Sequence, residues 1–521
     1  MKIKLFAAID VGSYEIAMKI FQFSSKSNAK HEGSMKEIDH IRHRIELGTD
    51  TYATGKISYA RMDELCRILR EFVTIMQTYK VDAYKAYATS AVRETENTMI
   101  ILDQIRIRTG IDVEVLSNSE QRFLDYKSIA SKGEGFHKIM EKGTAIADLG
   151  GGSMQLSLFD KDSLVTTQNI RVGVLRIRET MNVLKPRPSQ AESLLEEMID
   201  AQLNVFKKLY LKDREIKNII VVDDYVSGIL QKSIVKGMDK AGYIDRQCYL
   251  DFVEDIKNKM PESIARTYGI AAENAQLLQI AAVIIQRLLH IMDVELIWAP
   301  GVTLCDGIAY EYAEREKLIT SEHNFEQDII ACAGNISKRY MGSKKRSETL
   351  EKIALTIFDS MKKVHGLGRR ERLLLQLCTL MHDCGKYINM SNLGECSYNI
   401  ISSTEIIGLS HREREMVAHV VKYNHTTFPY YEGMGQHTLF DKQEYLVIAK
   451  LTAILRVANG LDRSHRQKFK NIKARLMEDE LRITVDTLDD ITLERELLNT
   501  RADFFEEVFS VRPVIKQKKV I

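Results

Sequence analysis

The sequence Ala8-Ile-Asp-Val-Gly-Ser13 has the same order of residue types as Ala147-Asp-Leu-Gly-Gly-Gly-Ser153. Each segment follows an apolar run and supplies an aspartate, then glycine, then a hydroxyl group. A carboxylate at a strand end and a glycine turn that lacks a Cβ suit the binding of phosphate oxygens. The two loops therefore predict a duplicated α/β fold that holds one phosphate chain between its halves.

The segments around the two loops follow a common plan. Residues 3–24 predict a strand pair around the first loop, and residues 145–148 and 155–159 predict strands on either side of the second. Apolar residues that recur at intervals of three and four predict a helix over residues 59–79, before a strand at 83–88. We interpret this repetition as a duplication followed by divergence.

Composition narrows the class of protein. A chain of 521 residues is too long for one hydrophobic core, and its net charge of only +2 favours neither nucleic acid nor a membrane as partner. Seven cysteines without a CxxC pair argue against a disulfide framework or a thiolate zinc site. No segment has the length expected of a signal sequence or membrane span. We therefore expect a cytoplasmic protein that binds neither DNA nor membranes.

The later part of the chain changes from a mixed strand and helix pattern to a mainly helical one. The segment Lys185-Pro-Arg-Pro188 precedes a helix expected to start near Ser189, with Glu192 completing a capping box. From about residue 320 the spacing of apolar residues predicts one helix after another, so we expect a domain boundary near 315–325. Helices are expected at 350–363, 370–382, 399–407, 411–422 and 443–459. A strand at 481–485 and a helix at 493–508 lead to a basic end, Lys516-Gln-Lys-Lys519, which we expect to be solvated.

Five further segments, together with the two loops, resemble in order and spacing the exopolyphosphatase/guanosine pentaphosphate phosphatase (Ppx/GppA) family. They are Tyr87–Glu94 with Asn97, Val115–Glu120, Pro300–Gly307, Met381–Gly385 and Leu461–His465. The resemblance implies a duplicated actin, sugar kinase and Hsp70-like (ribonuclease H-like) α/β core, an all-α HD-like domain and a small α+β segment. The implied domains are 1–122, 123–318 (with 300–318 returning to the first), 319–473 and 474–521.

The same resemblance assigns roles to residues. Glu120 corresponds to a catalytic glutamate that deprotonates the attacking water, and Asp148, with Glu120 or Asp10, would hold Mg²⁺. Arg93 would meet phosphate oxygens through its planar donor fork, or else form a surface ion pair with Glu94 or Glu96. The remaining phosphate-binding residues would be Asp10, Gly12, Ser13, Gly150, Gly151, Gly152 and Ser153.

Three segments depart from the family pattern. Gln155 stands where the family has a carboxylate two residues after the loop serine, and an amide is neither an anionic metal ligand nor a base. Tyr14 stands where Asn is common. The segment Val222-Asp-Asp-Tyr-Val-Ser-Gly228 replaces a glycine- and threonine-rich one, and its aspartates would repel phosphate if they faced it.

The HD-like domain carries a degenerate site. The His382-Asp383 pair is intact. Arg346, however, stands near the position of the family's first histidine, and Asn459 stands near that of its late aspartate. Asp462 lies one helical turn beyond Asn459. Leu393 and Cys396 replace further histidines. The cluster is therefore interpreted as a packed relic rather than a metal centre, because mixed imidazole and carboxylate shells need their full set of ligands.

The resemblance implies an Mg²⁺-dependent hydrolase that releases terminal phosphate from inorganic polyphosphate or guanosine pentaphosphate. Two alternatives remain: a weak or inactive sensor of guanosine tetraphosphate, guanosine pentaphosphate or polyphosphate, and a kinase of the same fold. The resemblance adds a homodimer. Basic residues could line a path for a long anion, or form a solvated face: Lys344, Lys345, Arg346, Arg369, Arg370, Arg372, Arg463 and Arg466.

Overall fold

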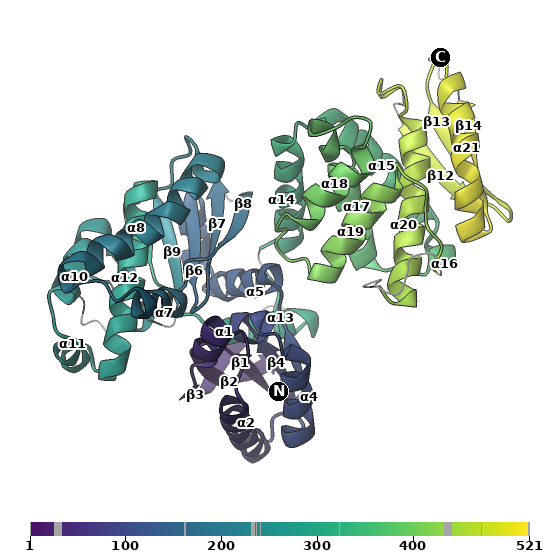
Figure 1. The fold of residues 1–521 in the computed structure, drawn as a ribbon. Helices are drawn as coiled ribbons and strands as arrows, with labels where there is room; N and C mark the ends of the chain where they lie inside the picture. The colour runs from purple at the N-terminus through teal and green to yellow at the C-terminus, as the bar shows by residue number, and fades with distance from the viewer. Residues whose placement is uncertain are drawn as a thin grey trace. The chain divides into compact units, whose positions relative to one another are not determined.

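The chain folds into two compact units, residues 1–325 and 326–521 (Figure 1). The computed structural model describes residues 2–25, 34–160, 163–223, 225–230, 235, 237–239, 241–321, 323–431, 440–469 and 471–518.

Two mixed sheets in the first unit repeat one topology. The first has the order β3-β2-β1-β4-β5, with β1 antiparallel to β2 and parallel to β4. The second has the order β10-β11-β9-β6-β7-β8, with β6 antiparallel to β7 and parallel to β9. Their strands are β1 (Lys2–Val11), β2 (Glu15–Ser25), β3 (Ser34–Arg44), β4 (Ala83–Ala88), β5 (Val113–Val115), β6 (Thr144–Leu149), β7 (Met154–Asp160), β8 (Ser163–Ile170), β9 (Asn218–Asp223), β10 (Tyr243–Asp245) and β11 (Leu296–Trp298). The repeat is the one that the matched loops predict.

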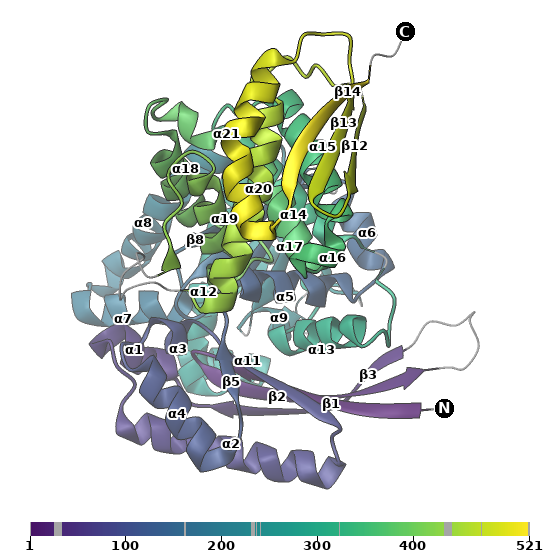
Figure 2. The ribbon, with the colours of Figure 1, turned by 90° about the vertical axis from the view of Figure 1, so that its right-hand side faces the viewer.

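Helices cover both faces of the first sheet. The side chains of β1 are therefore apolar on both faces, as in a sheet that is buried between two layers of helices. Figure 2 shows α2 and α4 on one face and α13 on the other. The helices of this unit are α1 (Leu47–Thr54), α2 (Tyr59–Tyr79), α3 (Ser90–Glu94), α4 (Thr98–Thr109), α5 (Asn118–Ala130), α6 (Glu134–Met140), α7 (Val174–Leu184), α8 (Pro188–Phe206) with the π-helix η1 (Lys207–Leu211), α9 (Ser227–Leu230), α10 (Arg246–Lys257), α11 (Pro261–Tyr268), α12 (Ala272–Met292) and α13 (Leu304–Arg315).

Helix α12 is, among the described residues, the one helix long and apolar enough to cross a membrane. Two thirds of its most apolar stretch, 67%, is buried inside the fold. It packs in the core of the second sheet, which accounts for its composition.

The second unit joins helices to a small sheet. The sheet has the order β12-β13-β14, with β12 antiparallel and β14 parallel to β13, and α21 packs on α20 and β14. Its elements are α14 (Phe325–Arg339), α15 (Lys344–Ser360), α16 (Lys362–His365), α17 (Arg369–Met381), η2 (Cys384–Tyr387), α18 (Leu393–Ser402), α19 (His411–Tyr423), α20 (Lys442–Leu461), β12 (Asn471–Leu476), β13 (Glu480–Asp486), α21 (Thr492–Phe509) and β14 (Arg512–Lys518).

The helix predicted near Ser189 is α8, which begins at Pro188, whose missing N–H costs nothing at a first helical position. The capping box expected there is wrong, because the residue before the helix is Arg187, which makes no side-chain cap. The Lys516 and Lys518 side chains are exposed, as expected of a solvated basic end, and the backbone of this segment also pairs with β13 as part of β14. Lys519 lies outside the described residues.

Candidate functional site

The two matched loops form the same turn. The Gly12 N–H donates to the Glu15 carbonyl over 3.0 Å, and the Gly150 N–H donates to the Ser153 carbonyl over 3.0 Å. A Cβ on Gly12 would lie 2.7 Å from the Glu15 oxygen, so this turn requires glycine. Each aspartate is the last residue but one of the strand that enters its turn, Asp10 on β1 and Asp148 on β6.

Both turns line one polar cavity of about 60 Å³ in the first unit. Four of its lining residues are aspartates, Asp10, Asp125, Asp148 and Asp223, and no Lys or Arg is among the described residues that line it. The other lining residues are Gly12, Ser13, Tyr14, Thr89, Ser90, Gln121, Leu149, Gly150, Gly151, Val222, Tyr225, Val302, Thr303 and Leu304. A phosphate group would enter this cavity only together with a cation that offsets the carboxylates.

The Ser13 hydroxyl ties the first loop to α3. Its Oγ lies 2.7 Å from Ser90 Oγ and 3.0 Å from Tyr52 Oη, and it accepts the Ala91 N–H over 3.1 Å. Ser13 is 6% exposed. These bonds fix the position of the first turn at the cavity.

The second loop is held by the start of α7. The Val174 N–H donates to the Gly150 carbonyl over 3.1 Å, and the Leu175 N–H donates to the Gly151 carbonyl over 2.9 Å. Because the N–H of a trans peptide points opposite to its C=O, the N–H groups of Gly151 and Gly152 point away from α7. Gly152 packs on Tyr52, and Ser153 is buried.

Gly173 permits this close packing, and the sequence analysis did not select it as a site residue. A Cβ at this position would lie 2.2 Å from the carbonyl carbon of Gly152 and 2.4 Å from the Ser153 nitrogen. Its φ is ordinary, so no turn pattern marks it in the sequence; only the approach of two backbones requires glycine here.

On helix α5, the adjacent residues Glu120 and Gln121 have different contacts. Glu120 forms a capping box with Ser117: its Oε2 accepts the Ser117 N–H over 3.0 Å. The cavity is lined instead by Gln121 and, one helical turn later, by the buried Asp125. The i, i+4 spacing is the signal that could have revealed Asp125.

Arg93 lies on α3 beside the start of α5. Its Nη1 donates to the Leu116 carbonyl over 2.7 Å and to Gln121 Oε1 over 3.4 Å. Gln121 Nε2 in turn donates to Asp148 Oδ2 over 3.4 Å. The structure thus brings together the predicted residues Arg93 and Asp148 through Gln121, a residue that the sequence reasoning did not select.

Gln155 lies directly opposite Asp148 in the β6–β7 register, so the two side chains share one face of the sheet. Gln155 is 3% exposed, and its Oε1 has no hydrogen-bond partner among the described residues. An uncharged acceptor therefore stands beside the aspartate of the second loop.

Asp223 lines the cavity at the end of β9. Its Oδ1 accepts the N–H groups of Tyr225 over 2.6 Å and Ser227 over 3.0 Å, and its Oδ2 accepts the Ser227 hydroxyl over 3.1 Å. The Asp223 carboxylate is therefore bonded to the loop that follows β9. Asp224 lies outside the described residues.

Tyr14 closes one side of the cavity. Its hydroxyl donates to Asn274 Oδ1 on α12, and its ring lies 5.7 Å from that of Tyr225. Burial raises the pKa of Tyr14, so it is a neutral donor near pH 7. Its position links the first loop to the second half of the unit.

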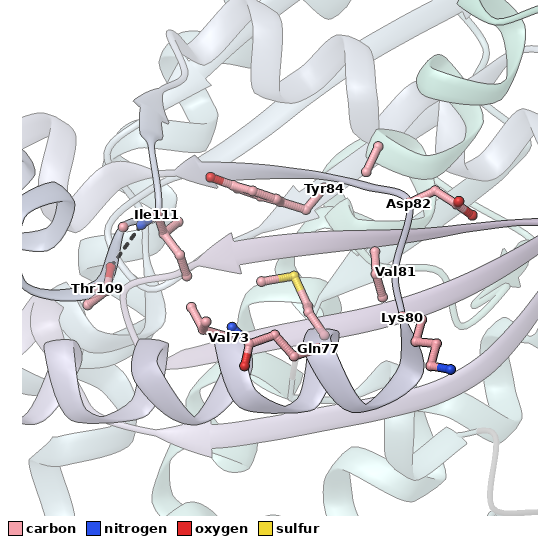
Figure 3. A pocket seen from close by; sticks show the side chains of 11 residues that line it. Val73, Gln77, Lys80, Val81, Asp82, Tyr84, Thr109 and Ile111 are labelled. Carbon is pink, nitrogen blue, oxygen red and sulfur yellow. Dashed lines mark hydrogen bonds between the residues drawn. The ribbon is translucent and has the colours of Figure 1, made fainter.

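A larger hollow of about 400 Å³ lies at the end of α2 (Figure 3). Two of its polar side chains bond to the backbone: Asp82 Oδ2 accepts the Leu5 N–H over 2.7 Å, and Thr109 Oγ1 accepts the Ile111 N–H over 3.1 Å. The floor is apolar, with Val73, Met76 and Val81. The smaller cavity is the candidate site because both predicted phosphate loops line it.

In the second unit, the residues of the predicted degenerate site lie close together. Arg346 lies among Asp383, Asp462 and Asn459, all buried, beside His382. Across the described part of the chain, no group of three or more His, Cys, Asp or Glu side chains is arranged to hold a metal ion.

Comparisons with known proteins agree with this architecture. The model of the Ppx/GppA phosphatase family matches residues 27–316, and that of Ppx/GppA phosphatase domain III matches residues 331–504. A guanosine-5'-triphosphate,3'-diphosphate pyrophosphatase of Vibrio vulnificus is 20% identical over 480 residues, covering 89% of this chain and 88% of the relative. One of Vibrio atlanticus is 18% identical over 428 residues, covering 80% of each.

Two solved structures share the fold. The crystal structure of the Aquifex aeolicus Ppx/GppA family member matches with a TM-score of 0.50 at 19% identity, covering 62% of this chain and 100% of that one. An exopolyphosphatase from Cytophaga hutchinsonii matches with a TM-score of 0.52 at 18% identity, covering 61% and 100%. These matches confirm the predicted actin-like core.

Proposed function

Because the chain belongs to the Ppx/GppA phosphatase family, we propose that it hydrolyses the terminal phosphoanhydride of inorganic polyphosphate or guanosine pentaphosphate. The observation that carries this proposal is the pair of equivalent Asp–Gly turns that line one polar cavity. The names of the relatives, a guanosine pentaphosphate pyrophosphatase and an exopolyphosphatase, support these two substrates.

The donor set of the cavity fits Mg²⁺. Asp148 and Asp10 supply hard oxygen ligands, and Mg²⁺ sites commonly use one or two carboxylates together with substrate phosphates and water, so no three-residue protein cage is needed. When bound, Mg²⁺ would neutralise charge on the transferring phosphoryl group. We propose Asp148 as its main ligand, with Glu120 or Asp10 as the second.

The chain's own residues supply the other parts of the reaction. We propose that the Glu120 carboxylate accepts a proton from the water that attacks the terminal phosphorus, while the bond to the bridging oxygen breaks and that oxygen leaves with its electrons. Glu120 Oε2 accepts the Ser117 N–H, which would orient the carboxylate. Arg93 and the turns of Gly12, Ser13 and Gly150 to Ser153 would hold the phosphate oxygens.

Phosphate release from long-chain polyphosphate and from guanosine pentaphosphate tests this proposal. With Mg²⁺, the purified chain should release phosphate from at least one of them, EDTA should stop the release, and added Mg²⁺ should restore it. An absence of release from both substrates, at a rate no higher than buffer alone, would overturn the hydrolase proposal.

A second candidate is a sensor that binds the same anions without turnover. The observation that favours it is the pair of amides, Gln121 and Gln155, on either side of Asp148. This candidate predicts that guanosine pentaphosphate raises the unfolding temperature in the presence of Mg²⁺ while no phosphate is released.

The remaining expectations also stand as proposals. We propose that residues 319–473 form an HD-like domain, that the chain is a homodimer, and that a path for a long anion is lined by Lys344, Lys345, Arg369, Arg370, Arg372, Arg463 and Arg466. Arg346, which the sequence placed in the same path, is buried and is not part of it. Sedimentation of the purified chain tests the dimer directly.

A further inference from the structure

A buried polar cluster lies inside the helical unit. Arg346 from α15, His382 and Asp383 at the end of α17, and Asn459 and Asp462 at the end of α20 converge there. The side chains of Arg346, Asp383 and Asp462 are 4%, 5% and 3% exposed. Buried carboxylates without a compensating cation are strongly unfavourable, so this cluster needs one.

The Arg346 guanidinium lies at the centre of the cluster. Its Nη2 donates to Asn459 Oδ1 over 2.7 Å, its Nη1 lies 3.8 Å from Asp383 Oδ2, and its Nε lies 3.9 Å from Asp462 Oδ2. The guanidinium thus faces both carboxylates and the amide from one position.

The groups around the guanidinium are those that coordinate divalent metals. His382 Nδ1 lies 2.8 Å from the Thr379 carbonyl, which only accepts, so Nδ1 carries the proton and Nε2 keeps its lone pair. Burial lowers the pKa of His382 to about 3, which keeps the ring neutral. His382 Nε2, Asp383 Oδ1 and Asp462 Oδ2 are buried atoms without a hydrogen-bond partner among the described residues.

The charges balance without a metal. Arg346 supplies one positive charge, and Lys386 supplies a second by donating to Asp383 Oδ2 over 3.3 Å. Together they offset Asp383 and Asp462, and the nearby Arg463 and Glu494 add one charge of each sign. Asn459 keeps this balance because an aspartate at its position would add a third negative charge beside Arg346.

We propose that the Arg346 guanidinium is the resident cation of this cluster and fills the place of a divalent metal ion. The helical unit is then metal-independent and carries no hydrolytic centre of its own. This inference concerns the second unit and does not depend on the chemistry proposed for the cavity of the first.

Metal content tests the proposal. The Arg346→His/Asn459→Asp variant, stripped with EDTA and reloaded with Mn²⁺, should retain about one more equivalent than the parent chain, and adding His382→Ala should remove it. Lys345→His, on the exposed side of the same helix, should gain none. The proposal is overturned if the parent already holds an equivalent that His382→Ala removes, or if the folded double variant gains no metal.

Thermal unfolding in EDTA gives a second test that needs no metal site. Arg346→Met should lower the unfolding temperature by about 5 °C or more, because two buried carboxylates lose their cation, and Arg346→Lys should lower it less. Lys345→Met should leave it unchanged. An Arg346→Met variant as stable as the parent would contradict a resident cation.

Discussion

Gln121 Nε2 donates to Asp148 Oδ2 over 3.4 Å, so an amide on α5 contacts the aspartate of the second phosphate loop. The neighbouring Glu120 caps its own helix through Ser117. The proposed base and the cavity-lining residue are therefore adjacent in sequence but differ in what they touch. Which of these two positions controls turnover is the first point to test.

Glu120→Gln should lower the rate of phosphate release about 100-fold or more, since an amide cannot accept the proton of the attacking water. Stability should change little, because the amide oxygen still accepts the Ser117 N–H. Steady-state kinetics and thermal unfolding of the same preparations measure both effects. Glu114→Gln, an exposed change on β5, serves as the control.

The opposite pattern would place the deciding position at residue 121. If Glu120→Gln keeps the parent rate and Gln121→Glu raises that rate at least tenfold, then Glu120 is not the base. The parent chain would in that case function mainly as the sensor.

Gly173→Ala should displace the second loop, because the new Cβ would meet the backbone of Gly152 and Ser153. We expect a loss of at least tenfold in kcat/KM and a lower unfolding temperature. Gly228→Ala is the matched control near the same cavity, since a Cβ there meets nothing within 4 Å. Equal effects of both substitutions would contradict the role given to Gly173.

His40 should make the first unit sensitive to acid. Burial, then the charges of Lys19 and Arg42, lower the pKa of His40 to about 4, whereas the unfolded chain has the ordinary value of 6.5. The folded state therefore binds fewer protons, and its stability is complete above pH 6.5 and falls as the pH drops toward 4. Between pH 7 and pH 5 the loss should be about 1–2 kcal/mol.

Urea unfolding at the two pH values measures this loss, and His40→Gln should reduce the difference between them. Other buried histidines keep part of the pH dependence in the variant. A variant whose stability falls as steeply as that of the parent would contradict a neutral His40.

The elements with strong local signals could be predicted closely from the sequence. The helix expected at 59–79 is α2 and the strand expected at 83–88 is β4, because their apolar spacing reports directly on burial. The edge strands β3, β8 and β14 were missed. They pair through backbone groups, and their half-exposed sequences lack a clear alternation.

The candidate site divides in the same way. Asp10, Gly12, Ser13, Asp148, Gly150 and Gly151 do line one cavity, because each turn follows a strand that ends at it. Gln121 and Gly173 depend on how α5 and α7 pack against the second loop, which no local pattern encodes, whereas Asp125 follows from Gln121 by its i, i+4 spacing. The sequence places Arg346 at the degenerate site of the helical unit, but its contacts with Asp383, Asp462 and Asn459 are visible only where three helices meet.

Phosphate release by the Asp148→Asn variant with Mg²⁺, measured beside the parent chain, tests the central proposal most directly. Asp160→Asn, an exposed change on β7, is the control. Loss of the carboxylate proposed to hold Mg²⁺ should lower the rate at least 100-fold, while the control keeps the parent rate. An Asp148→Asn variant that releases phosphate within twofold of the parent would show that hydrolysis takes place elsewhere.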